Sequence, residues 1–78
     1  MTHAPVTDTQ FAVCIHNAEY PAALELRKIY QIVPDAAATQ QHLLRVIDES
    51  GEDYLYPADY FLQVELPQSV KEALLEAA

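Results

Sequence analysis

Apolar and polar side chains alternate along several short stretches of the chain, which is the pattern of half-buried β-strands. Residues 10–16 alternate between two faces, one of which carries Phe11, Val13 and Ile15. A β-branched run over residues 29–33 ends at a proline, which cannot donate to a sheet ladder. The alternation changes phase near Lys28, so we expect a kink or bulge before this second strand.

A hairpin follows. Residues 43–48 and 54–56 flank an acidic segment that holds Gly51, the only glycine of the chain. Glycine adopts the positive φ that a tight turn requires, so the two stretches are predicted to pair. Residues 57–60 begin with a proline and cannot continue a central strand, and residues 61–66 are predicted as one more strand or extended segment.

Two helical segments are predicted outside the strands. Asp35 can cap one helical turn over residues 36–38. Residues 67–78 carry an apolar stripe with helical spacing, made up of Val70, Ala73, Leu74 and Ala77. Ser69 and Glu72 have the spacing of a capping box. So short a helix is unstable alone. We therefore expect it to dock on its own chain, leaving a monomer, or alternatively on a second copy in a homodimer.

The length and composition indicate a single folded domain. The chain has 78 residues, of which 51% are hydrophobic and 21% charged, and this balance favours a folded core over a disordered chain. Residues 1–9 have no apolar period and are predicted to be a flexible tail. Residues 10–66 form the strand-rich body, and residues 67–78 the C-terminal helix.

Two motifs resemble Src-homology-3-type (SH3-like) barrels. Residues 24–28, Leu-Glu-Leu-Arg-Lys, resemble the diverging turn of that family, and residues 56–61, Tyr-Pro-Ala-Asp-Tyr-Phe, resemble its last two strands with one helical turn between them. The resemblance covers residues 10–66. It implies a mainly β fold, a small SH3-like five-stranded β-barrel with a short C-terminal α-helix, and it places Tyr30 and Ile32 in the core.

The same resemblance gives an expectation about function. Small bacterial stand-alone barrels of this architecture generally serve as accessory or binding modules. In peptide-binding members the positions of Pro57 and Tyr60 line a groove for polyproline ligands. Two features differ, because Leu43 stands where the family has its groove tryptophan, and the loop at residues 17–23 is short with one acid, Glu19. The predicted binding surface consists of Tyr60, Pro57, Leu43, Tyr54, Tyr20 and Glu19.

The five tyrosines fall into two groups by their positions. Tyr30 and Tyr56 are in strand phase with the core. Tyr20, Tyr54 and Tyr60 are loop-borne or close to turns, where a tyrosine offers rigid contact area with a polar tip. We therefore expect the second group to form an exposed aromatic cluster.

Charge narrows the choice of partner. Twelve acidic residues against four basic ones give a net charge of −8, which repels phosphate backbones and anionic lipid. We therefore expect a protein partner, no nucleic acid and no membrane. An acidic patch of four carboxylates in the hairpin turn is expected to face water, and it consists of Asp48, Glu49, Glu52 and Asp53. These lack the ligand spacing of a calcium loop. An alternative function is an acidic regulator, inhibitor or antitoxin-like, that neutralises a basic partner.

No constellation of residues indicates catalysis. Cys14 and His16 share one strand face with Cα atoms about 6.6 Å apart, too far for a direct nucleophile–base hydrogen bond. As a metal pair they need further ligands from His42, His3 or loop acids. We expect a partly buried cysteine, a solvated histidine, and no enzyme activity, cofactor or metal. One cysteine, the start of the chain and the lack of a long apolar run favour the cytoplasm.

Overall fold

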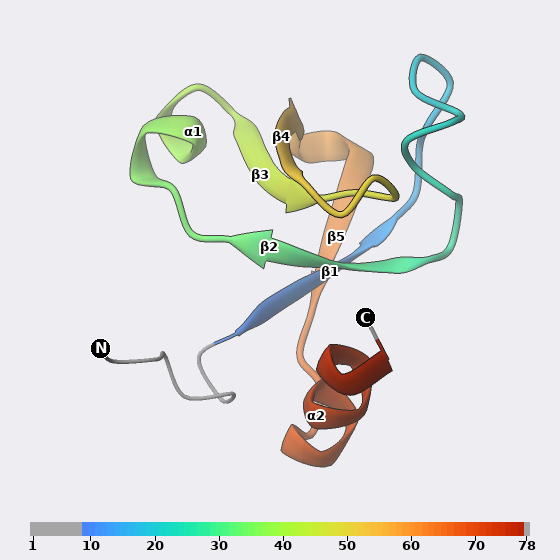
Figure 1. Cartoon of the computed structure of the whole chain (residues 1–78). Helices are drawn as coiled ribbons and strands as arrows, with labels where there is room; N and C mark the ends of the chain where they lie inside the picture. The colour runs from blue at the N-terminus through green and yellow to red at the C-terminus, as the bar shows by residue number, and fades with distance from the viewer. Residues whose placement is uncertain (1–8, 78) are drawn as a thin grey trace.

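The structure is a computed structural model that describes residues 9–77. In this part of the chain five antiparallel strands form one sheet, accompanied by two α-helices and a 3-10 turn (Figure 1). The elements in order are β1 (Gln10–Cys14), β2 (Ile29–Val33), α1 (Ala36–Gln40), β3 (Leu43–Ile47), β4 (Asp53–Pro57), η2 (Ala58–Tyr60), β5 (Phe61–Val64) and α2 (Gln68–Ala77). The predicted tail, residues 1–9, lies outside the described residues except for Thr9.

The strands are ordered β4-β3-β2-β1-β5, so the first strand pairs with both the second and the last. No pairing in the described sheet joins β4 to β5, and the sheet is therefore open rather than closed into a barrel. The prediction of a mainly β protein with five strands and a C-terminal helix is confirmed. The closed barrel is not seen, because β4 and β5 are joined through η2 and not through a hydrogen-bonded ladder.

Both faces of β1 are buried. Ala12 and Cys14 are fully buried and belong to the core cluster, whereas Phe11, on the opposite face, is 4% exposed. The alternation predicted from the sequence is therefore correct, but the main core uses the face with the smaller side chains. Ala12 and Cys14 leave room there for the large rings contributed by other strands. The strand ends two residues earlier than predicted, and the Ile15 amide donates to the carbonyl of Tyr60 (2.8 Å).

The connection between β1 and β2 spans residues 15–28 and is longer than the sequence suggested (Figure 1). It folds back through turns, and the Asn17 side chain donates to the carbonyl of Leu24 (2.8 Å), whose own side chain is buried. The expected kink near Lys28 is a full turn, because the Lys28 amide donates to the carbonyl of Glu25 (3.3 Å) and Arg27 has a φ of 69°. This turn lies in the segment that resembles a diverging turn.

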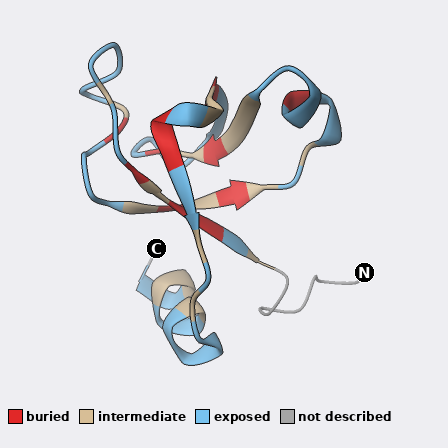
Figure 2. Ribbon diagram, turned by 180° about the vertical axis from the view of Figure 1, so that it is seen from behind, coloured by how far each residue is buried: buried red, intermediate tan, exposed pale blue. Residues whose placement is uncertain are grey.

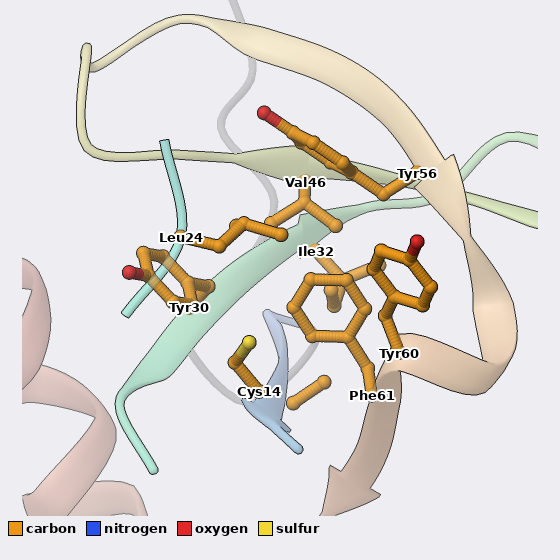
Figure 3. Packing of buried hydrophobic residues seen from close by; sticks show 9 residues of the cluster. Cys14, Leu24, Tyr30, Ile32, Val46, Tyr56, Tyr60 and Phe61 are labelled. Carbon is orange, nitrogen blue, oxygen red and sulfur yellow. The ribbon is translucent and has the colours of Figure 1, made fainter. Parts of the chain in front are cut away.

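The core is built from aromatic side chains packed around a few aliphatic ones (Figure 3). Tyr30, Ile32 and Tyr56 are each at most 5% exposed, as the sequence predicted. The rings of Tyr30 and Phe61 meet edge-on with centroids 6.4 Å apart. Most buried residues lie on the strands, while α2 and most connections are intermediate or exposed (Figure 2).

The hairpin turn corrects one prediction. Asp48 was expected to face water but is only 7% exposed. Its carboxylate accepts hydrogen bonds from the amide (2.9 Å) and hydroxyl (2.5 Å) of Ser50 and from the hydroxyl of Tyr56 (2.6 Å). The turn can close in this way because Gly51 adopts a φ of 84°. Asp48 is thus a structural residue that satisfies the polar tip of a buried ring.

Helix α1 begins where predicted and runs two residues further. The side chain of Asp35 caps it by accepting from the amide of Ala38 (3.1 Å), and the same carboxylate accepts from Arg45 on β3 (2.9 Å). His42 adopts a φ of 61° just after the helix, which is the left-handed conformation that ends many helices. The short helix is thereby held against the sheet.

Helix α2 lies on the opposite side of the sheet from α1 (Figure 1). It begins at Gln68, so Ser69 lies inside the helix and the predicted capping box is wrong. None of its described residues is buried. Leu74 and Leu75 are half-buried and line a groove of about 500 Å³ together with residues of the sheet, including Phe11 and Ile29. Of the predicted stripe, Leu74 and Ala77 line this groove, whereas Val70 is 40% exposed.

We predict that Asp48→Asn lowers the free energy of unfolding by about 1–2 kcal/mol at neutral pH, because it places an amide donor against the Tyr56 hydroxyl. Burial alone would raise the pKa of Asp48, but hydrogen bonds from Ser50 and Tyr56 outweigh it and hold the pKa below its usual value. A lowered folded-state pKa stabilises the fold above about pH 4, and this contribution is lost as the pH falls further.

Urea unfolding measured at neutral pH and at about pH 3 tests this expectation. The difference between wild type and Asp48→Asn should shrink in acid. Glu52→Gln, at an exposed position of the same turn, is the matched control and should unfold like wild type at both pH values. An Asp48→Asn variant as stable as wild type at neutral pH would contradict the structural role.

Candidate functional site

A connection, a strand and the 3-10 turn bring four aromatic rings together. We call this cluster the aromatic surface, and it consists of His16, Tyr20, Tyr56 and Tyr60. The ring of Tyr20 meets Tyr56 edge-on with centroids 5.0 Å apart, and it lies 6.1 Å from Tyr60. The ring of His16 meets the ring of Tyr60 edge-on with centroids 4.7 Å apart. The first two residues come from the β1–β2 connection, whereas Tyr56 belongs to β4 and Tyr60 to η2.

Tyr60 anchors the aromatic surface. Its side chain is 8% exposed, so it is buried and not exposed as the sequence suggested. Its hydroxyl donates to a carboxylate oxygen of Glu19, which ties the β1–β2 connection to η2. This hydrogen bond, together with burial and the charge of Glu19, raises the pKa of Tyr60 to about 12. The phenol therefore stays protonated at neutral pH and acts as a fixed donor.

Tyr20 is the accessible ring of the cluster. It is 40% exposed, while two other tyrosine rings, Tyr56 and Tyr60, pack against it. Glu19 precedes it in the sequence, and the exposed Asp59 lies next to Tyr60 on the other segment. The negative charges of Glu19 and Asp59 both act on the Tyr60 hydroxyl. An exposed ring that packs against a tyrosine under the influence of two carboxylates is a suitable contact for an apolar or positively charged group.

The structure unites only part of the predicted binding surface. Tyr20, Tyr60 and Glu19 lie together, as described above. Leu43 and Pro57 are direct partners across β3 and β4 and share the sheet face opposite to that of Tyr56. They are therefore outside the aromatic surface. Tyr54 is 51% exposed and shares the face of Tyr56, two residues away along β4.

The predicted acidic patch is largely paired within the protein. The carboxylate of Glu49 accepts from the hydroxyl of Tyr30 (2.5 Å) and contacts the ammonium of Lys28 (2.6 Å). Lys28 and Tyr30 lower the pKa of Glu49. Asp53 forms an ion pair with Arg45 (3.0 Å). Asp48 is buried. The side chain of Glu52, in contrast, is exposed and has no hydrogen bond or ion pair with the described residues.

The hydrogen bond that joins Cys14 and His16 runs from the thiol to the backbone and not to the imidazole ring. The thiol of Cys14 is fully buried and donates to the backbone carbonyl of His16 (3.3 Å), and burial raises the pKa of the thiol. His16 is exposed, as predicted, but local periodicity does not predict that its ring packs on Tyr60, which is distant along the chain. Among residues 9–77 no three histidine, cysteine or acidic side chains are grouped closely enough to hold a metal ion.

The chain was compared with protein families, curated proteins and solved structures. No known protein family, curated protein or solved structure matches this chain. Within residues 9–77, no helix has the length and apolar character that crossing a membrane requires.

We predict that Glu19→Gln lowers the pKa of Tyr60 from about 12 toward the usual value near 10, because the acceptor loses its charge. NMR with carbon-13-labelled tyrosine can follow each ring separately. In wild type Tyr60 should remain largely protonated at about pH 11, and in Glu19→Gln it should be largely ionised. Glu52→Gln is the control and should leave Tyr60 unchanged. The same titration curve for Tyr60 in wild type and Glu19→Gln would contradict the hydrogen bond.

Proposed function

We propose that the protein is a non-catalytic interaction module with an SH3-like architecture, acting in the cytoplasm and binding a partner protein through the aromatic surface. Three features support the SH3-like arrangement: β5 lies beside β1, a tight turn precedes β2, and the 3-10 turn η2 separates β4 from β5. The cytoplasmic assignment rests on the single cysteine, which cannot form an intramolecular disulfide.

The observation that carries the proposal is the exposed ring of Tyr20, held by Tyr56 and Tyr60. A tyrosine fixed in this way supplies contact area without a large entropic cost on binding. The hydrogen bond between Glu19 and Tyr60 fixes the segment that carries it. The surface is thus pre-organised for contact with another protein.

The partner we favour is an extended protein segment that contains a positively charged side chain. A guanidinium or ammonium group can lie over the face of Tyr20, and the negative charges of Glu19 and Asp59, which act on the neighbouring Tyr60, favour a cation there. The net charge of −8 also steers basic partners toward the protein. Two basic residues of this chain pair with acids outside the aromatic surface. Lys28 pairs with Glu49, and Arg45 pairs with Asp35 and Asp53.

An acidic regulator that neutralises a basic partner is the second candidate, and the net charge of −8 is the observation in its favour. The acidic patch of the hairpin turn supports this candidate less than expected, because Asp48, Glu49 and Asp53 form hydrogen bonds or ion pairs within the protein. The two candidates differ in their dependence on salt. Binding dominated by net charge should weaken steeply between low and physiological salt, whereas binding to a ring should weaken modestly.

We predict that Tyr20→Ala weakens the binding of an arginine-containing peptide about tenfold, since a cation–π contact and its apolar surroundings are worth about 1–2 kcal/mol. The probes are short unstructured peptides with one arginine between apolar residues, and matched peptides with neutral citrulline in place of arginine. NMR titration gives both the affinity and the residues that shift.

The matched control is Leu62→Ala, which removes an exposed side chain on β5, 57% exposed and away from the rings, and it should bind as wild type does. Equal affinity for the arginine and citrulline peptides, or shifts confined to residues outside the aromatic surface, would overturn the proposed site. Loss of most of the affinity at physiological salt would favour the acidic regulator instead.

A further inference from the structure

The outer edge of β4 offers unpaired backbone groups that the proposed function does not use. β4 is the last strand of the described sheet on that side and pairs only with β3. The Asp48 amide donates to the carbonyl of Glu52 (3.1 Å), and the Ala58 amide donates to the carbonyl of His42 (2.9 Å). These two bonds fix which residues of β4 point their backbone groups toward β3.

In an antiparallel pair, every second residue exchanges hydrogen bonds with its partner strand. Because residues 52 and 58 bond inward, residues 54 and 56 do so too. The amide and carbonyl groups of Asp53 and Leu55 therefore point away from β3, toward the open edge. The backbone of Pro57 also points away from β3. The absence of an amide hydrogen on Pro57 therefore removes no hydrogen bond between β3 and β4.

The centre of this edge carries none of the usual protection against pairing. Natural edge strands are blunted by lysines, inward-pointing charges, prolines or bulges. Here the central residues are Tyr54 and Leu55, uncharged and 51% and 43% exposed. The charge at the start of the strand, Asp53, is paired with Arg45 (3.0 Å). Only Pro57, at the very end, resembles a blocking residue.

We propose that a second copy of this chain pairs with β4 in antiparallel orientation, about a two-fold axis that passes through Leu55. Each Leu55 donates its amide to the carbonyl of the other Leu55. Each Asp53 donates its amide to the carbonyl of Pro57 in the other copy. The two sheets join into one continuous sheet, and the interface is the same patch on both copies.

The positions of the charged residues favour this register, even though each copy has a net charge of −8. With Leu55 on the axis, Asp53 of each copy faces an uncharged proline. The two Asp53 residues are four positions apart along the paired strands, which is about 13 Å at the strand rise per residue. Their repulsion is therefore strongly screened at physiological salt, where the screening length is about 8 Å.

The pairing also gives Tyr54 a role. Tyr54 shares the sheet face of Tyr56, and in the proposed register it lies directly opposite Tyr56 of the second copy. Directly opposed side chains that are not in a hydrogen-bonded pair approach closely, and aromatic pairs there are stabilising. The rings of the two copies then form one aromatic row across the sheet. This dimer does not depend on the peptide-binding function proposed above.

Sedimentation of the full chain over a range of concentrations up to ~0.5 mM tests the proposal. Wild type should form a dimer in this range. Leu55→Lys should raise the dimer dissociation constant at least about tenfold, because it places two ammonium groups opposite each other on the axis. Leu62→Lys is the matched control, as it adds the same charge at an exposed position of β5, and it should dimerise like wild type. Circular dichroism confirms that both variants are folded.

Amide hydrogen exchange of the wild-type protein gives a second readout that needs no variant. The Leu55 amide should become protected as the protein concentration rises, while Tyr54 and Tyr56 are protected at all concentrations. A protein that stays monomeric throughout this range would overturn the proposal. So would a dimer that persists in Leu55→Lys, one that is lost in Leu62→Lys, or one that forms without protecting the Leu55 amide.

Discussion

Each of three core tyrosines donates its hydroxyl hydrogen to a carboxylate that comes from a connecting segment. The pairs are Tyr30 with Glu49, Tyr56 with Asp48, and Tyr60 with Glu19. A domain of 78 residues has little core, and large rings supply much of the apolar area that it can bury. A phenol oxygen at the boundary of that core needs a partner, because a buried unpaired polar group is costly. The acids provide it, and no buried side-chain oxygen or nitrogen of residues 9–77 is left without one.

These pairs fold the acidic connections onto the sheet. The phenol oxygens point outward from the core cluster (Figure 3), where the connecting segments pass. Glu19 fixes the β1–β2 connection and positions Tyr20, while Asp48 and Glu49 close the hairpin turn. Part of the negative charge of the protein is therefore structural. Other acids are exposed, and Asp59, which follows η2 residue Ala58 and precedes Tyr60, is the one among them that the proposed contact would use.

The periodicity of the sequence predicted the strands well because short antiparallel strands depend on local alternation. It predicted β2, the hairpin around Gly51, and the core positions of Tyr30 and Tyr56. It could not predict that Asp48 is buried or that Tyr60 reaches Glu19, since such pairs join residues distant in the sequence through the fold. Local sequence alone favoured exposed positions for both Asp48 and Tyr60. Tertiary hydrogen bonding changed both.

The account is tested most directly by native-state hydrogen exchange on a variant in which Tyr30, Tyr56 and Tyr60 are all replaced by phenylalanine. The rings remain and only the donors to the acids are lost. If the hydroxyl–carboxylate pairs hold the connections, amides in residues 15–28 and 48–53 should lose protection, while the central strands β1 and β2 keep theirs. Unchanged protection in both connections would show that packing alone positions them, and would contradict the account.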